Sequence, residues 1–197
     1  MENSKLLAQV VYQGKDKSVD FYEDRVEFNG NSINYADITE ITPSYSSVTY
    51  NFVIGWLTSK ITIRSSTQMM MLKKGGFSIF GIGNKKSATK VFESVFNEIY
   101  NIVALSVAKK YVERTRAGEI IAFGRFQISS DGIAYKDKLV INKDNFESFQ
   151  LGSMYGYIFP VVLNEKGKAA FSANLKQVNL ILISHIFNEL SNGWRNS

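Results

Sequence analysis

Two stretches of the chain, DRVEFNGNSINYAD (24–37) and DGIAYKDKLVINKD (131–144), align without a gap at an offset of 107 residues. The alignment pairs Asp24 with Asp131, Val26 with Ile133, Phe28 with Tyr135, Ile33 with Val140, Tyr35 with Asn142 and Asp37 with Asp144. Self-similarity at a fixed offset predicts a repeated structural unit. The order of the surrounding elements must then repeat as well.

The order of elements does repeat in the sequence. Each half begins with short β-rich runs that alternate apolar and polar residues, separated by turn residues such as those at 29–31 and 65–67. Each half then changes to the spacing of an amphipathic helix. The first helix is expected over 88–116, with Ser87 as N-cap and Gly118 as C-cap, either continuous or broken near 104–106. The second is expected after an Asn174 cap, with apolar positions at Leu175, Val178, Ile181, Leu182, Ile186, Phe187 and Leu190.

This pattern predicts an α+β, mainly β chain made of two antiparallel domains, each closed by a C-terminal helix. The expected domains are 1–103 and 118–197, joined by a helical connection, 104–117, that continues the first helix. No Pro/Gly/Ser-rich linker separates the two halves.

The segment AGEIIAFGRFQISSDGIAYKDKLVINKDNFESF (117–149) resembles the opening of bacterial and GRAM-like members of the pleckstrin-homology-like (PH-like) superfold. The resemblance covers both halves, more clearly the second, and implies two half-open PH-like barrels in tandem, each plugged by its helix. The basic phosphoinositide pocket of some PH domains does not carry over. The matching stretch here sets Lys15 and Lys17 beside Asp16 and Asp20.

Composition excludes several kinds of chemistry. The 197 residues include no cysteine, which excludes disulfide scaffolds, thiolate metal sites and cysteine nucleophiles and suits a reducing cytoplasm. The N-terminus does not read as a secretory signal, and no run of 18 apolar residues predicts a membrane span. We therefore expect a cytoplasmic protein, which lies at the inner membrane surface if its ligand is a lipid.

One stretch, KKGGFSIFGIGNKK (73–86), stands out because it sets apolar residues among glycines and encloses them with lysine pairs. It starts like a P-loop, but Ile82 and Gly83 stand where Lys and Ser/Thr must meet the phosphates, so the nucleotide interpretation fails. In the favoured interpretation, residues 77–80 form a last strand or a lid that packs onto the barrel, and the glycines let the chain turn into the helix. In the other, the apolar residues are an exposed tip that enters a membrane while the lysines attract anionic lipid. The candidate contacts with a membrane or a partner are Lys73, Lys74, Phe77, Ile79, Phe80, Ile82, Lys85 and Lys86.

A second basic cluster gives the chain a candidate basic face. It consists of Lys109, Lys110, Arg114 and Arg116, in a chain of net charge +5. Tyr111 among these cations fits nucleic-acid binding loosely, but the same charges fit the solvated end of a helix. The sequence does not favour nucleic acid.

Catalytic patterns are scarce. His185 is the only histidine and is expected to be a packed or rim residue. The aspartates that recur in the repeat, at 24, 37, 131 and 144, are expected to cap turns. We therefore predict a non-catalytic intracellular binding module without cofactor, metal or small-molecule substrate. It would act through a protein partner or self-association, for which Trp56, Tyr155 and Tyr157 in strand regions are suited. The alternative is peripheral binding to anionic lipid through 73–86.

Overall fold

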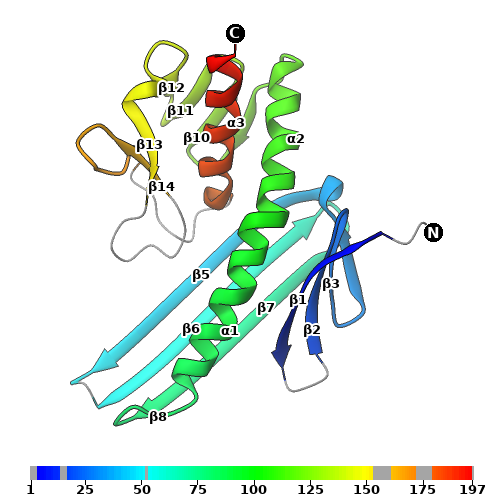
Figure 1. Cartoon of the computed structure of the whole chain (residues 1–197), viewed down its shortest axis with the longest axis vertical. Coiled ribbons are helices and arrows are strands. Elements are labelled where there is room, and N and C mark those ends of the chain that lie inside the picture. The colour runs from blue at the N-terminus through cyan, green and yellow to red at the C-terminus, as the bar shows by residue number, and fades with distance from the viewer. Residues whose placement is uncertain (1–3, 14–16, 52, 153–160, 172–178, 197) are drawn as a thin grey trace. The chain divides into compact units, whose positions relative to one another are not determined.

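The computed structural model describes residues 4–13, 17–51, 53–152, 161–171 and 179–196 (Figure 1). The chain is mainly β, with antiparallel sheets and a helix after each set of strands. This confirms the coarse prediction of the fold class. The packing divides the chain into two compact units, residues 1–103 and 104–197.

The first unit begins with a four-stranded antiparallel meander. Its strands are β1 (Leu6–Gln13), β2 (Lys17–Tyr22), β3 (Arg25–Phe28) and β4 (Asn31–Asn34), in that spatial order. Asn29 and Gly30 have positive φ, 51° and 76°, and form the two-residue turn between β3 and β4, where the sequence predicted one. Alternate side chains of this sheet are buried, among them Val19, Phe21, Val26, Phe28 and Ile33.

A second antiparallel sheet follows the 3-10 turn η1 (Tyr35–Asp37). Its strands are β5 (Ile38–Tyr50), β6 (Ile54–Ser65), β7 (Met69–Ile79) and β8 (Ile82–Gly83), in that order. The inner face of this sheet carries buried side chains that include Leu57, Ile61, Ile63, Met70 and Leu72.

Helix α1 (Lys85–Glu98) lies over the inner face of the second sheet (Figure 1). It contacts β6 and β7 and also β1, so both sheets of the unit share one core with the helix. Phe92 and Phe96 are buried in this core, and the ring of Phe92 stacks on Tyr45 with the centroids 5.5 Å apart.

The ends of the first helix differ in part from the prediction. The N-cap is Asn84, three residues before the predicted cap, Ser87, which instead donates its hydroxyl to the carbonyl oxygen of Asn84 at 2.9 Å. At the other end Gly118 has a φ of +91° and directly follows the C-cap residue Ala117. A glycine was predicted there for this conformational reason.

The helical backbone is continuous from Lys85 to Arg116. A π-helical segment, η2 (Ile99–Ala104), separates α1 from α2 (Leu105–Arg116), close to the position where a break was one of the two expectations. By length and composition alone this stretch could cross a membrane. However, 44% of its most apolar window is buried, and α1 and α2 both contribute core residues, which favours a core helix.

After helix α2, the second unit follows the order of the first: a four-stranded meander, a 3-10 turn, further antiparallel strands and a helix. Strands β9 (Ile121–Phe123), β10 (Phe126–Ser129), β11 (Gly132–Tyr135) and β12 (Lys138–Asn142) form a four-stranded antiparallel meander. The 3-10 turn η3 (Phe146–Ser148), the antiparallel pair β13 (Phe149–Gly152) and β14 (Val161–Asn164), the turn η4 (Leu180–Leu182) and helix α3 (Ile183–Arg195) follow. Helix α2 packs against α3 and β10, so the segment 104–117, expected to be a connection, is part of this unit's core.

The structure corrects the second half of the gapless alignment between 24–37 and 131–144. Strands β3 and β11, and β4 and β12, start at the predicted offset. A register shift after Ile133 then places Ile141 opposite Ile133, as Ile33 lies opposite Val26. The structural equivalent of Ile33 is therefore Ile141 and not Val140.

The pairing of Tyr35 with Asn142 is also wrong. Tyr35 and Phe146 are the buried first residues of η1 and η3, so these two correspond. The predicted helix positions Asn174, Leu175 and Val178 and the strand tyrosines Tyr155 and Tyr157 lie outside the described residues.

Candidate interaction surface

The stretch 73–86 forms the end of β7, a tight turn, β8 and the start of α1. Its apolar side chains are exposed: Phe77 by 51%, Ile79 by 45%, Phe80 by 74% and Ile82 by 81%. The predicted strand is confirmed for 77–79, which end β7, but Phe80 lies in a turn, and a further short strand, β8, leads into the helix. The prediction that these side chains pack onto the barrel is wrong.

Strand register shows that these residues belong to a larger surface. Val48, Trp56 and Phe77 lie directly opposite one another on β5, β6 and β7. The next row on the same face is Tyr50, Ile54, Ile79 and Ile82. Cross-strand partners share a face, and so do alternate residues along a strand, so the two rows adjoin. We call this surface the apolar tip; it consists of Val48, Tyr50, Ile54, Trp56, Phe77, Ile79, Phe80 and Ile82.

Exposed hydrophobic side chains are concentrated in the apolar tip and are not scattered over the surface. It holds eight of the fifteen large hydrophobic side chains that are exposed in the described part of the chain. Single exposed hydrophobic residues are normal, whereas a contiguous patch marks a site of interaction. Sequence reasoning named four of these residues as candidate contacts and Trp56 as suited to a protein partner, and it missed Val48, Tyr50 and Ile54. The alternation along 46–57 together with the hairpin register would have found them.

Glycines explain why the apolar side chains face away from the core. A Cβ on Gly76 would lie 2.8 Å from the Cα of Lys85 and 2.9 Å from the Cβ of Ala88. A Cβ on Gly55, on the same inner face, would lie 3.0 Å from the side chain of Lys85. Helix α1 therefore starts directly on this inner face, and no side chain fits at Gly55 or Gly76. The large residues of the same strands are left on the outer face.

The turn at the extremity of the tip carries unfavourable backbone geometry. Phe80 and Gly81 have φ of 49° and 77°, the left-handed pair required by a two-residue hairpin turn. Glycine and asparagine suit this conformation, whereas a bulky residue is an outlier there. The N–H of Phe80 donates to the carbonyl oxygen of Val53 at 2.6 Å and ties this turn to the β5–β6 turn. Strain at an exposed aromatic residue points to a role outside the fold.

The segment that carries the apolar tip, 41–92, has charge of one sign. Residues 41–92 contain no aspartate or glutamate. They contain seven cations: Lys60, Arg64, Lys73, Lys74, Lys85, Lys86 and Lys90. Most of the second sheet and the first half of α1 therefore present only positive charge.

The predicted lysines divide into two groups. Lys74 donates to the carbonyl oxygen of Tyr12 at 2.5 Å, and Lys85 donates to the carbonyl oxygen of Val48 and the hydroxyl of Thr49, both at 2.8 Å. These two lysines stabilise the fold. Lys73 and Lys86 are exposed and available. An open depression of about 430 Å³ beside the tip is lined by Ser78, Gly81, Lys85, Lys86, Thr89, Lys90 and Glu93.

The candidate basic face on α2 is divided. Lys109, Glu113 and Arg116 are exposed on one side of the helix, so an acid lies between two of the cations. Arg114 donates to Glu119 at 2.6 and 2.9 Å and lies over the ring of Tyr111. Lys110, one turn before Arg114, is half-buried. The structure therefore does not bring Lys109, Lys110, Arg114 and Arg116 together as a single cationic surface.

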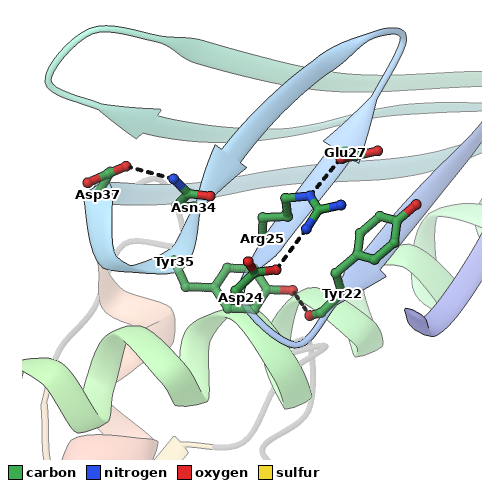
Figure 2. A network of polar contacts seen from close by, with 7 residues as sticks. All are labelled: Tyr22, Asp24, Arg25, Glu27, Asn34, Tyr35 and Asp37. Atoms are coloured by element: carbon green, nitrogen blue, oxygen red, sulfur yellow. Dashed lines mark hydrogen bonds and ion pairs between the residues drawn. The ribbon is translucent and has the colours of Figure 1, made fainter. Parts of the chain in front are cut away.

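The first-unit aspartates form a structural network, shown in Figure 2. Arg25 bonds Asp24 at 3.1 Å and Glu27 at 2.7 Å, and its guanidinium lies 4.1 Å from the centroid of the Tyr22 ring. The hydroxyl of Tyr35 donates to the carbonyl oxygen of Tyr22 at 2.8 Å. A hydrogen bond from Ser4, and next the charge of Arg25, lower the pKa of Asp24. Its carboxylate is thus held ionised beside a cationic partner.

The predicted capping role of the other aspartates needs correction. Asp37 accepts a hydrogen bond from the side chain of Asn34 at 3.3 Å. In the second unit the capping side chains are Ser129 and Asn142, which accept the backbone N–H of Asp131 and Asp144 at 3.2 and 3.0 Å. His185 is half-buried on α3. The described residues contain no cluster of three or more His, Asp or Glu side chains that could hold a metal ion.

No family model matches the chain, and neither the curated proteins nor the solved structures yield a match. The functional argument therefore depends on the surface itself.

Proposed function

We propose that this protein is a non-catalytic binding module that attaches to anionic membrane surfaces through the apolar tip of its first unit. The observation that carries the proposal is the contiguous exposed patch at the end of β5–β8, set in a segment, 41–92, that has seven cations and no acid. Tyrosine and tryptophan favour the membrane interface, and each lysine near an anionic surface contributes about 1 kcal/mol.

The sequence favoured a protein partner or self-association, and the charge distribution changes that preference. In a symmetric dimer through the apolar tip, the cations of one copy would face those of the other, and like charges oppose such an interface. An anionic lipid surface supplies the opposite charge without needing a shape that matches the tip. The cytoplasmic leaflet is the anionic one, in agreement with the expected location.

We also propose that the two units are PH-like domains in tandem. Three features support this: a four-stranded antiparallel meander, a further antiparallel sheet, and a helix that follows the strands in each unit. In this proposal the membrane contact is the outer face of the second sheet and not the pocket between the first strands that some PH domains use. No cofactor or catalytic residue is assigned.

Cosedimentation with vesicles tests the membrane proposal. The parent protein is expected to pellet with vesicles that contain an anionic phospholipid and much less with phosphatidylcholine alone. Phe77→Asp combined with Phe80→Asp should weaken binding at least about tenfold, because two carboxylates replace inserted aromatic rings. The matched control, Ile120→Asp with Leu139→Asp, removes two comparably exposed apolar side chains of the second unit and should bind like the parent.

A milder variant separates binding from folding. Phe80→Asn suits the left-handed turn better than phenylalanine, so the fold should be at least as stable while vesicle binding weakens. Equal pelleting of the parent and the Phe77→Asp/Phe80→Asp variant would show that the tip does not insert. A stable dimer that ignores vesicles would favour the protein-partner alternative.

A further inference from the structure

Two lysines lie directly opposite each other on the outer face of the second sheet. Lys60 on β6 pairs with Lys73 on β7, and Ser44 on β5 completes the same row. We call Ser44, Lys60 and Lys73 the lysine row. It lies on the face that carries the apolar tip, because all three residues are an even number of positions from Val48, Trp56 and Phe77 along their strands.

Between the lysine row and the apolar tip, the sheet offers hydroxyl groups and no carboxylate. The residues there are Ser46, Thr58 and Gly75, and a Cβ on Gly75 would find only the carbonyl oxygen of Leu57 within 4 Å, at 3.8 Å. On the other side of the lysine row, the carboxylate of Glu40 accepts a hydrogen bond from the hydroxyl of Thr42 at 2.8 Å and pairs with Arg64 at 3.6 Å. Among the described residues neither Lys60 nor Lys73 makes a salt bridge. Directly opposite residues have Cα atoms about 5 Å apart, and like charges so placed destabilise a sheet. An anion held between the two ammonium groups removes this cost.

We propose that the lysine row binds the phosphate of a phosphomonoester lipid headgroup, and this inference rests on the proposed membrane function. A phosphomonoester carries about −1.5 to −2 charges at neutral pH, whereas a phosphodiester carries about −1. Two ammonium groups and a serine hydroxyl match the dianion in charge and in number of donors.

The spacing along the strands places this site at headgroup level. On β6, Lys60 lies four residues after Trp56, a separation of about 13 Å along the strand. A flexible lysine side chain shortens this separation by snorkelling towards the interface. With Trp56 at the boundary of the hydrocarbon, the ammonium groups reach the phosphates of the same leaflet.

Tryptophan fluorescence can report the binding, because Trp56 in the tip and Trp194 on α3 are the two tryptophans of the chain. In a Trp194→Phe background the blue shift of Trp56 is titrated with two vesicle series in phosphatidylcholine. One series contains phosphatidic acid, a phosphomonoester, and the other contains phosphatidylglycerol, a phosphodiester, at matched surface charge. The parent is expected to bind the phosphatidic acid series about tenfold more tightly.

The decisive comparison uses two variants that each remove two charges near the membrane. Lys60→Gln with Lys73→Gln should lower the preference for phosphatidic acid to less than about twofold. Lys86→Gln with Lys90→Gln, on the exposed side of α1, should weaken binding to both series equally and keep the preference. Glycerol phosphate without vesicles separates a lipid from a free phosphate as the source.

The outcomes separate this inference from the proposed function. Equal affinity of the parent for the two series would overturn the phosphomonoester site while leaving membrane attachment intact. The same preference in the Lys60→Gln/Lys73→Gln variant would also overturn it. Saturation by glycerol phosphate well below about 1 mM would overturn the lipid as the source of the phosphate. Binding to neither series would overturn both proposals.

Discussion

Two buried tyrosines of the first unit differ in one hydrogen bond. The hydroxyl of Tyr35 donates to the carbonyl oxygen of Tyr22 at 2.8 Å (Figure 2). The hydroxyl of Tyr12 is buried without a hydrogen-bond partner among the described residues, while its ring packs edge-on against Phe28 with centroids 5.5 Å apart. The first hydroxyl therefore stabilises the fold, and the second costs desolvation that no partner offsets.

We expect opposite effects from removing the two hydroxyls. Tyr12→Phe should raise the free energy of unfolding by about 1 kcal/mol, and Tyr35→Phe should lower it by about 1 kcal/mol. Chemical unfolding followed by Trp56 fluorescence in the Trp194→Phe background measures both changes. A loss of stability in Tyr12→Phe would mean that its hydroxyl has a partner after all.

Stability should also fall at alkaline pH. Burial raises the pKa of Tyr12, Tyr35 and Tyr111 above the ordinary value near 10. In the unfolded chain these phenols ionise near pH 10, whereas in the folded protein they keep their protons to higher pH. The folded state then binds more protons, so the unfolding free energy is unaffected by these groups below about pH 10 and decreases as the pH rises above it.

Unfolding curves at about pH 9 and about pH 11 measure this decrease. The Tyr35→Phe variant should lose less stability over the interval than the parent, which separates the tyrosine contribution from that of the lysines. Spectroscopic titration in which all ten tyrosines ionise together near pH 10 would contradict the explanation.

At the scale of the elements, two adjacent glycines have different roles. A Cβ on Gly76 would meet the backbone of helix α1 at 2.8 Å, whereas the nearest atom to a Cβ on Gly75 lies 3.8 Å away. Gly76→Ala should therefore push α1 away from β7 and lower the free energy of unfolding by about 1–3 kcal/mol. Gly75→Ala should change it by less than about 0.5 kcal/mol, because it makes only an ordinary contact.

Thermal or chemical unfolding of the two variants gives the comparison directly. Equal stability would mean that the helix does not start on the inner face of the sheet at Gly76. The pair also serves as a check on the exposed tip, because the packing of the helix on that face is what leaves Phe77 and Ile79 outside.

The sequence allowed the elements to be predicted but not their register. Alternating apolar residues and the turn at Asn29 and Gly30 were enough to place strands β3 and β4 and their counterparts in the second unit. The bulge after Ile133 could not be predicted, because one additional residue reverses which side chains face the core. Ile141 therefore takes the place that the gapless alignment gave to Val140.

At the scale of the whole molecule, only part of the candidate surface could be predicted, because the pairing between strands was not known from the sequence. The local pattern identified Phe77, Ile79, Phe80 and Ile82 as unusual, but alternation alone does not say which face of a strand is covered. That depends on where the helix returns, and the indication lies in Gly55 and Gly76, small residues that alternate with large ones. Val48, Tyr50 and Ile54 join the surface only through pairing between strands that are distant in sequence.

The cations and the apolar side chains contribute to binding through different forces, so we can predict how vesicle binding depends on salt concentration. The cations of segment 41–92 act over the Debye length, which falls from about 10 Å at 0.1 M salt to about 3 Å at 1 M, whereas burial of apolar side chains does not weaken with salt. Affinity for anionic vesicles should therefore fall about tenfold over this range but should not vanish. Residual binding in high salt should be lost in Phe77→Asp/Phe80→Asp and kept in the Ile120→Asp/Leu139→Asp control. Vesicle titrations at the two salt concentrations measure both components. Binding that is independent of salt would show that the positive segment does not face the lipid, and the tip would then have to engage an uncharged surface instead.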